Sequence, residues 1–466
     1  MDVAAVPGRD MLDVVGIGFG PSGIALAAAI DDAQEKAGYA HYLRARFYER
    51  RANSAWHPDF MLEGSDINNH FLRDLATPRD PRSRYTFANY LKAKGRLHDF
   101  GLLGRAPSRQ EWSDYVEWVA RQLSRYACYD DSVEDVRPLL ARGVLTGFVV
   151  ESARGRSTAT NLVVSVGAEP FISEPFRAHA GARIFHTSQF ISRIEALPKT
   201  LQCFVVIGGG QSAGEAIFDL RRRFPGADIV GIQRSSGFKL YDLGHFSNRV
   251  YSPDGTDYFY GLPPEHKASA LTETLRTNYS GLDYEISAAL FQQIYEDRVA
   301  GSPRIHLRTR CKVDAIDVAD DRIGIRVVDA FSGAGEIIAA DAVVLATGFT
   351  VRAIPPVMEN MRPLMRLDAG GEPLVNRDYS VQFAPRCTAG LYLNGLCEHS
   401  HGIGEGQSFS MLALRGETIL GSLLDRRLRG RDDSEDAPEP ASLTRHSGDA
   451  VASGEERGSI PREWRA

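Results

Sequence analysis

Apolar runs of four to six residues, each followed by a glycine turn and an apolar helix, recur along this chain. The segment LDVVGIGFGPSGIALAAAI (12–30) has this order, which is typical of the first strand, turn and helix of a βαβ unit. The same order returns about 190 residues later at TLQCFVVIGGGQSAGEAIFDL (200–220). The pattern therefore predicts an α/β protein with two Rossmann-like dinucleotide-binding domains.

The segments between and after these two units predict that the second domain is inserted in the first. The run DAVVLATGF (341–349) is again a buried strand that ends in a glycine turn, and an amphipathic helix is expected at 410–424. From about 430 the sequence is polar, charged and rich in proline, so a disordered tail is expected. The expected ranges are 11–195 for the first part of the first domain, 196–340 for the second domain with a mostly helical substrate segment at about 240–300, 341–425 for the return to the first domain, and 430–466 for the tail.

Composition narrows the class of protein. A length of 466 residues exceeds what one core usually supports, and 54 Lys and Arg against 60 Asp and Glu give a net charge of −6, which argues against nucleic acid as a partner. The five cysteines are scattered without metal-ligand spacing, so no metal site is expected. No apolar run approaches the roughly 18 residues of a membrane span. We therefore expect a soluble, cytoplasmic protein with reduced thiols.

The first glycine turn contains Gly16, Gly18, Gly20 and Pro21. In such a turn the first glycine allows a tight bend and the second lets backbone N–H groups approach a pyrophosphate at the helix N-terminus. Glu49 ends a second short apolar stretch, where an acid can bind a ribose hydroxyl. The alternative is a glycine-rich strand–helix turn that binds no ligand.

The second glycine turn contains Gly208, Gly210, Gln211 and Ser212 and fits the GxGxxA pattern. The strand that follows, 228–233, ends at Arg234 and two serines instead of an acid. A guanidinium with neighbouring hydroxyls suits a 2′-phosphate, which favours NADPH over NADH. The alternative for Arg234 is a solvated surface arginine.

Several motifs in order resemble one enzyme family. They are GIGFGPSG (16–23), the Trp56-His57 pair, FLRDL (71–75) with TPRDP (77–81), GGGQSAGE (208–215), and the ATGF turn with Thr347 and Gly348. Together they look like the flavin-dependent N-hydroxylating monooxygenases, and more specifically the ornithine N5- and lysine N6-hydroxylases of siderophore biosynthesis. The similarity runs from about 13 to 424, and TNYS (277–280) together with the FSN stretch (246–248) favours the ornithine branch.

This resemblance implies FAD and NADPH as cofactors. NADPH would reduce the flavin, oxygen would add at flavin C4a, and the hydroperoxyflavin would transfer its distal oxygen to a neutral substrate amine, so that the protein positions reactants and excludes water. The resemblance also implies a homo-oligomer, a tetramer in this family, and a place in siderophore or related secondary metabolism.

The resemblance further assigns residues to the site. Trp56, His57 and Asn68 would lie beside the cofactors, while Arg73 would contact the substrate carboxylate. Asn248 and Asn278 would hold the amino-acid head, since an amide offers both a donor and an acceptor. Ser410 would supply a hydroxyl near the C-terminal helix. Asn278 and Arg73 are the residues that we expect to matter most for catalysis.

Other functions stay open at this stage. L-lysine or another primary amine could replace ornithine, and a different two-dinucleotide flavin monooxygenase, such as a Baeyer–Villiger or sulfur-oxidising enzyme, is a second class. The FxGxxxHxxxW/Y element of those relatives is absent between the two glycine turns, since Phe185-His186 lacks the glycine pattern. A disulfide reductase would need a CxxC or CxxxxC pair, which the chain lacks. A flavin sensor or NADPH-binding scaffold without catalysis is the remaining alternative.

Overall fold

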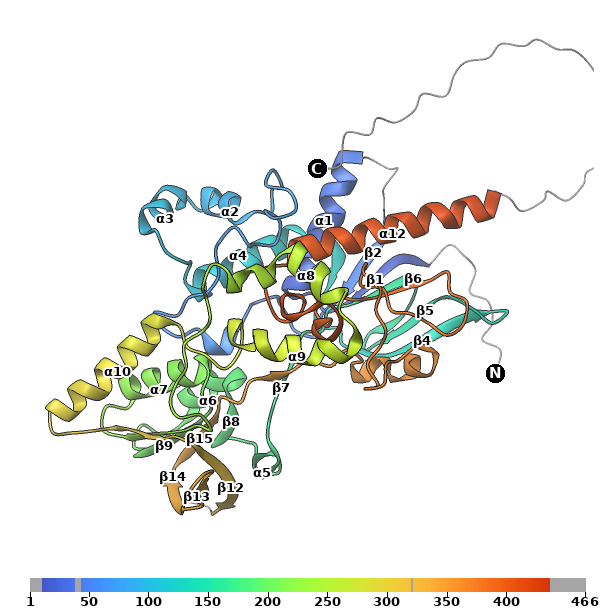
Figure 1. The fold of residues 1–466 in the computed structure, drawn as a ribbon. Coiled ribbons are helices and arrows are strands. Elements are labelled where there is room, and N and C mark those ends of the chain that lie inside the picture. The colour runs from blue at the N-terminus through green and yellow to red at the C-terminus, as the bar shows by residue number, and fades with distance from the viewer. Residues whose placement is uncertain (1–10, 38–42, 320–321, 436–466) are drawn as a thin grey trace, which may run out of the picture.

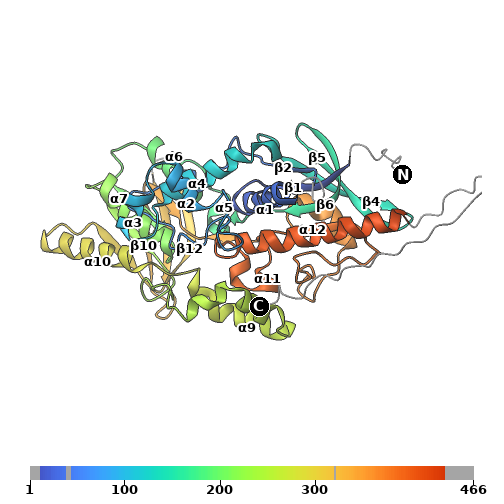
Figure 2. The ribbon, with the colours of Figure 1, turned by 90° about the horizontal axis from the view of Figure 1, so that it is seen from above.

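The computed structural model describes residues 11–37, 43–319 and 322–435, which form an elongated molecule with a large sheet in each half (Figure 1 and Figure 2). The strands of the first sheet, in spatial order, are β3 (Ala127–Cys128), β2 (Ala45–Tyr48), β1 (Leu12–Ile17), β6 (Gly155–Val164), β5 (Val144–Ser152) and β4 (Val133–Ala141). β17 (Gly390–Leu393) pairs in parallel with the second half of β6. A strand from late in the chain thus completes the sheet that β1 begins.

Three helices cover this first sheet. α1 (Pro21–Ala37) is fully buried from Ile24 to Ile30, because its alanines let neighbours approach on all sides. α12 (Leu412–Glu435) packs along α1 at Gly416, where a Cβ would lie 3.4 Å from the backbone of Ala25. α4 (Arg109–Gln122) begins after Ser108, whose side chain accepts a hydrogen bond from the N–H of Glu111. These helices and the first sheet share the largest of the three hydrophobic clusters among the described residues.

The second sheet is entirely parallel. Its strands, in spatial order, are β11 (Ile305–Arg308), β10 (Asp228–Ile232), β9 (Cys203–Ile207), β15 (Ala342–Leu345) and β8 (Ile184–His186). Successive residues of β9 point to opposite faces: Phe204 and Val206 pack toward α7 (Gln211–Arg223), while Val205 packs toward a three-stranded antiparallel sheet. That small sheet contains β12 (Cys311–Val318), β13 (Ile323–Asp329) and β14 (Gly335–Ala340).

The chain crosses between the halves twice, at two short strands that pair with each other. β7 (Glu169–Pro170) carries it into the second half and β16 (Phe349–Thr350) carries it back. The second domain is therefore inserted in the first, as expected. However, β8 and β15 belong to the second sheet, so the crossings lie near 170 and 349 instead of at 195/196 and 340/341. The three-residue β8 has no glycine turn after it, and this is why the sequence pattern misses it.

The remaining elements lie in the segments between the strands and helices described above. The segment expected to be helical at 240–300 contains η5 (Ser247–Tyr251), α8 (Pro253–Tyr260), α9 (Pro264–Thr274), η6 (Leu275–Thr277) and α10 (Tyr284–Val299), which confirms its helical character. The others are η2 (Pro58–Phe60), α2 (Phe87–Ala93), α3 (Leu97–Leu103), η3 (Ser124–Tyr126), α5 (Glu174–Arg177), η4 (Thr187–Gln189), α6 (Phe190–Ala196), η7 (Pro356–Leu364), α11 (Glu398–His401) and η8 (Ile403–Glu405). α12 continues to Glu435, past the expected start of the tail at 430, and 436–466 lie outside the described residues.

Candidate active site

The first glycine turn leaves an open space before α1. Gly18 has a φ of +94°, and a Cβ there would lie 2.4 Å from the carbonyl oxygen of Ser165. The space beside Gly18 is therefore filled by the protein and leaves no room for a ligand. At Gly20 a Cβ would meet nothing within 4 Å, and Pro21 then begins the helix. The position that can admit a ligand to the helix N-terminus is thus Gly20, while Gly18 is required by the bend.

Two further glycines set how closely α1 approaches the sheet. A Cβ at Gly16 would lie 2.1 Å from the ring of Phe47, and a Cβ at Gly23 would lie 2.4 Å from the carbonyl oxygen of Gly18. In the GxGxxG pattern the third glycine lets the helix pack closely against the strand, and Pro21 stands at that position in this chain. In the structure, Gly23 allows this close packing instead. The sequence signal that could have predicted this role is the position of Gly23 in the first turn of an apolar helix.

Glu49 joins the end of β2 to the first glycine turn. Its carboxylate is buried and accepts hydrogen bonds from the N–H of Phe19 at 3.0 Å and from the N–H of Arg51 at 2.9 Å. Each oxygen retains a lone pair, so the group can still accept from a ribose hydroxyl. The turn, the open helix N-terminus and this carboxylate together fit the ADP half of a dinucleotide.

The second glycine turn is covered by the helical segment. A Cβ at Gly208 would lie 2.2 Å from the carbonyl oxygen of Ala346, and a Cβ at Gly210, the N-cap of α7, would lie 3.7 Å from the backbone of Ser280. The Gln211 side chain is fully used inside the protein: its oxygen accepts from the N–H of Asp283 at 2.8 Å and its amide donates to Asp283 and Glu215. This leaves the backbone N–H groups at the start of α7, near Ser212, as the groups that could donate to a phosphate.

Cationic side chains cluster at the end of β10. Arg234 is exposed there, next to Ser235, whose hydroxyl donates to the carbonyl of Gly237 at 2.8 Å. Lys239 donates to the hydroxyl of Ser236 at 3.0 Å, which places a second cation beside the same serines. The sequence pattern missed Lys239 because it lies beyond the motif. The group suits a 2′-phosphate, which requires charge-assisted donors.

The Thr347-Gly348 turn lies at the crossing between the halves. Its Gly348 carbonyl accepts from the N–H of Phe171 at 2.9 Å and lies 2.9 Å from Nε2 of His186. Thr347 donates its hydroxyl to the carbonyl of Phe171. Burial lowers the pKa of His186, which favours a neutral ring that donates from Nε2 to this carbonyl. The turn therefore fixes where the two halves meet.

Trp56, His57 and Asn68 form one wall between the halves. The Trp56 ring contacts Phe409 edge-on at 5.1 Å and His57 at 4.6 Å. Partial desolvation, followed by the charges of Arg109 and Arg51, lowers the pKa of His57, which favours a neutral ring at physiological pH. Asn68 has a left-handed backbone with φ of 49° and donates its N–H to Asp66 at 2.9 Å.

Arg73 and Ser410, 337 residues apart, meet in the structure. Nη1 of Arg73 donates to the Ser410 hydroxyl at 3.1 Å, and its guanidinium lies 5.9 Å from the centre of the Tyr251 ring. Tyr251 in turn shares a 2.9 Å hydrogen bond with Thr277, the neighbour of Asn278. Within 11–37, 43–319 and 322–435 no carboxylate lies within 4.0 Å of the Arg73 guanidinium. Arg73 is thus a half-buried cation that has no anionic partner among the residues that the structure describes.

Two residues absent from the sequence-based prediction also belong to this cluster. The Tyr279 hydroxyl donates to the Glu398 carboxylate, and this hydrogen bond joins the helical segment to α11. Burial raises the pKa of both groups. Their 119-residue separation left no sequence signal. Asn248 is less closely joined: its side chain donates to the carbonyl of Gly244 at 3.3 Å in its own loop.

Two classes of site are not found in the part of the chain that the structure describes. No group of three or more His, Cys, Asp or Glu side chains is placed to hold a metal ion there. No helix in that part is both long and apolar enough to span a bilayer. The polar residues described above therefore stand as the candidate site.

Comparisons with known proteins identify the family. Residues 10–351 match the model of the family described as L-lysine 6-monooxygenase/L-ornithine 5-monooxygenase. An L-ornithine N(5)-monooxygenase of Burkholderia cepacia is 36% identical over 84% of this chain and 90% of its own length. The crystal structure of L-lysine 6-monooxygenase from Pseudomonas syringae is 41% identical, with a TM-score of 0.82 over 89% of this chain and 99% of that one.

A third relative was solved with ligands. An ornithine N-hydroxylase of a Kutzneria species, in a complex with reduced FAD, NADP+ and L-ornithine, is 30% identical, with a TM-score of 0.84 over 90% of this chain and all of that one. These relatives cover nearly the whole described chain, both sheets and the helical segment included. The chain is therefore a member of the L-lysine 6-monooxygenase/L-ornithine 5-monooxygenase family, a family of flavin-dependent N-hydroxylating monooxygenases.

Proposed function

We propose that this protein uses FAD and NADPH to hydroxylate the side-chain amine of a free amino acid, with L-ornithine as substrate and N5-hydroxyornithine as product. The observation that carries the proposal is Arg73, a half-buried guanidinium that has a hydroxyl neighbour and no carboxylate neighbour among the described residues. A cation in that state favours an anion brought by the substrate, and an α-carboxylate can be gripped bidentately.

The residues present fit both cofactors. Gly20, the N-terminus of α1 and Glu49 would hold FAD, while the turn at 208–210 and the cations Arg234 and Lys239 would hold NADPH. When bound, NADPH supplies two electrons and the flavin activates oxygen. Overall, the amine, O2, NADPH and a proton give the hydroxylamine, NADP+ and water.

The protein's own contribution is to bind and orient the amino acid. Arg73 would fix the carboxylate, with Ser410 holding the guanidinium, and the amides of Asn248 and Asn278 would serve the α-amino and carboxylate groups. Tyr279 and Glu398 hold the helical segment against α11, which reduces access of water to the reacting amine. The assignments of Asn248, Asn278 and the cofactor-binding residues stay predictions.

L-lysine is the second candidate substrate, because the 41% identical relative carries the name of a lysine monooxygenase. A substrate screen separates the candidates: hydroxylamine formation and NADPH oxidation are measured in parallel with ornithine, lysine and putrescine. We expect ornithine to give hydroxylamine in proportion to NADPH consumed. Lysine, longer by about 1.3 Å, should release mostly peroxide, since near-attack geometry tolerates little displacement. Coupled turnover with lysine alone would reverse the assignment.

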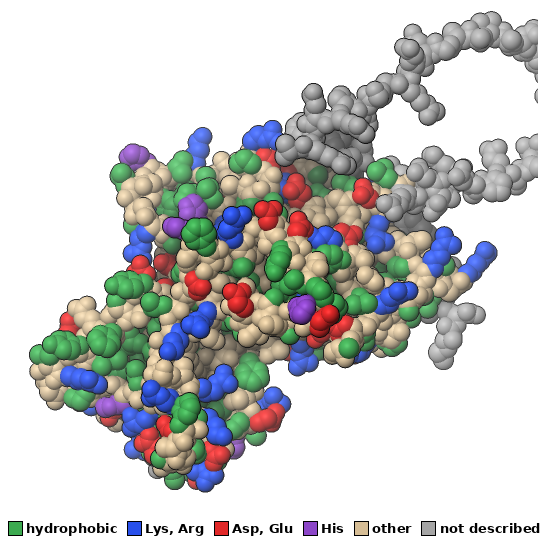
Figure 3. Space-filling model, viewed as in Figure 1, with side chains coloured by type: hydrophobic (Ala, Val, Ile, Leu, Met, Phe, Trp, Pro, Cys, Tyr) green, Lys and Arg blue, Asp and Glu red, His purple; other side chains and the backbone are tan. Residues whose placement is uncertain are grey.

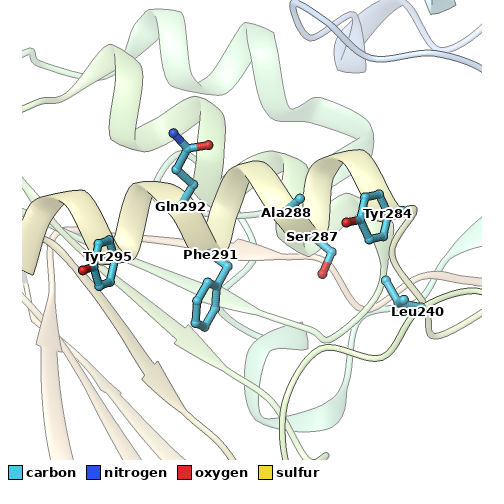
Figure 4. A pocket seen from close by; sticks show the side chains of 7 residues that line it. All are labelled: Leu240, Tyr284, Ser287, Ala288, Phe291, Gln292 and Tyr295. Atoms are coloured by element: carbon cyan, nitrogen blue, oxygen red, sulfur yellow. The ribbon is translucent and has the colours of Figure 1, made fainter.

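Self-association through α10 forms part of the proposal. Tyr284, Phe291 and Tyr295 are 71%, 72% and 63% exposed on one face of this helix. They line an open cavity of about 470 Å³ (Figure 4), together with Leu240, Ser287, Ala288 and Gln292. At about 150–250 Å² each when fully buried, and with about two thirds of each side chain exposed, the three aromatics offer about 300–500 Å², roughly half of the about 800 Å² per partner that a standard interface buries. A second copy of this chain can supply the matching aromatic face.

Light scattering on size-exclusion fractions tests this surface. Phe291→Ser should shift the protein to a smaller assembly than the wild type. Phe331→Ser is the matched control, because Phe331 is 84% exposed but lies at the turn between β13 and β14. Equal masses for the two variants and the wild type would remove α10 from the interface. We place the assembly in the cytoplasm, where NADPH is maintained, and in siderophore or related secondary metabolism.

A further inference from the structure

A buried ion pair connects the two halves of the molecule. Arg109, the first residue of α4, donates from Nη1 to Oε2 of Glu215 at 3.0 Å and from Nη2 to Oε1 at 2.9 Å. Glu215 lies on α7, directly behind the second glycine turn. The two side chains are only 10% and 3% exposed. The pair is thus bidentate and almost completely removed from water.

On the side of the first sheet, the same arginine holds the chain that forms the wall of the site. Nη1 of Arg109 also donates to the carbonyl of Phe60 at 2.9 Å, and its backbone N–H donates to the carbonyl of Ser65 at 3.0 Å. The Phe60 ring packs edge-on against Phe190, within the core of the second sheet. The wall from His57 to Asn68 is therefore held at both halves.

On the other side, the network reaches the helical segment. Oε1 of Glu215 accepts from the amide of Gln211 at 2.9 Å, and the Gln211 oxygen accepts from the N–H of Asp283 at 2.8 Å. Asp283 caps α10 by accepting from the N–H of Ile286 at 2.6 Å. Four side chains thus connect α4, the start of α7 and the start of α10.

Stability alone does not explain this arrangement. Removing two charges from water is expensive, and apolar side chains of similar volume at such a place are often neutral or stabilising. A bidentate pair differs from an apolar contact because it has one preferred geometry. It holds α4 and the start of α7 in a single relative orientation, whereas an apolar contact would tolerate sliding.

We propose that Arg109 and Glu215 are positioning residues that set the second glycine turn, and with it the nicotinamide coenzyme, at the distance from the flavin site that hydride transfer requires. This inference rests on the proposed function for its cofactors. It adds a role for residues that contact neither the amino acid nor the reacting atoms. Gln211 and Asp283 extend the same hydrogen-bond network to the helical segment, so the network positions both the coenzyme and the substrate.

The test replaces the pair with apolar residues of similar size, Arg109→Met together with Glu215→Leu. The matched control is Arg221→Met with Asp297→Leu, because Arg221 and Asp297 also form a bidentate pair, at 2.9 and 2.8 Å, but join α7 to α10 within the second half. Flavin content, melting temperature, NADP+ affinity by calorimetry and anaerobic flavin reduction by NADPH and by dithionite are measured on each holoenzyme.

We expect the first double variant to keep its FAD and to be reduced normally by dithionite. Its reduction by NADPH should fall at least about tenfold and its dissociation constant for NADP+ should rise, while the control stays within about twofold of the wild type. Wild-type reduction by NADPH in the first variant would show that the pair only stabilises the fold and would overturn the proposal.

If the double variant does not fold, Arg109→Lys replaces it, because it keeps the charge opposite Glu215 and removes the bidentate geometry. The same slower reduction by NADPH supports the proposal and a normal rate overturns it. None of these measurements requires an amine. A wrong choice of substrate would therefore leave them unchanged, and failure of the proposed function can be told apart from failure of this inference.

Discussion

Arg73→Ala is the sharpest test of the substrate site. The structure gives this side chain one hydrogen bond, from Nη1 to Ser410 at 3.1 Å, and no carboxylate within 4.0 Å among the described residues. Burial lowers the pKa of Arg73, in keeping with a cation that lacks compensation. Its removal leaves no buried carboxylate unpaired, so we expect the variant to fold and to retain both cofactors.

The expected magnitude follows from the contact that is lost. A charge-assisted hydrogen bond contributes about 1.5–3 kcal/mol, so the KM for ornithine should rise about 10- to 150-fold while the KM for NADPH stays unchanged. Arg73→Lys keeps the charge but loses the planar guanidinium, so its KM for ornithine should lie between those of the wild type and Arg73→Ala. Ser410→Ala should have a smaller effect, because it removes one neutral partner.

Steady-state assays of hydroxylamine formation at varied ornithine measure these effects. Arg249→Ala serves as the control, because Arg249 is an exposed arginine on η5, close to the same site. Unchanged ornithine kinetics in Arg73→Ala would refute the carboxylate contact. So would putrescine as a better substrate than ornithine, since it has no carboxylate for Arg73 to bind.

Three further predictions concern the cofactors and the core. Gly18→Val should abolish FAD retention, because its Cβ would lie 2.4 Å from Ser165, whereas Gly20→Ala should fold and only weaken flavin binding; flavin absorbance of the purified proteins measures both. Arg234→Ala should weaken NADPH binding by about 1.5–3 kcal/mol and spare NADH, as calorimetry with each coenzyme would show. Burial lowers the pKa of His401 to about 3, so its stabilising effect is complete above about pH 6.5 and lost as pH falls toward 3; thermal melts of wild type and His401→Phe should diverge below pH 6.5.

The strand–turn–helix units could be predicted from the sequence because each is local. The glycines at 16–20 and 208–210 lie between an apolar strand and an apolar helix, and the structure places both at the ends of β1 and β9 as expected. The insertion of the second domain in the first was predicted from the order of these units along the chain. The predicted domain boundaries were wrong because the sheet to which β8 and β15 belong depends on which strands they pair with. A pattern of residues along the chain does not contain this information.

The polar contacts between distant segments could not be predicted from the residues alone. Arg73 and Ser410 were named together only because of the family resemblance, and the structure joins them. Arg109 and Glu215 are 106 residues apart, and the sequence offers no signal that joins them. Burial of both charges depends on how the halves meet, which is a property of tertiary packing.

The insertion of one half in the other has a consequence for how the chain is made. The second sheet is formed from one continuous stretch between β7 and β16, so it can be completed while the nascent chain is still being extended. The first sheet lacks β17 until the ribosome has passed Leu393, and Ser22 at the start of α1 meets its partner Arg415 later still. At about 5–20 residues per second, the N-terminal strands wait tens of seconds for these partners. The half that begins the chain is therefore the last to be completed.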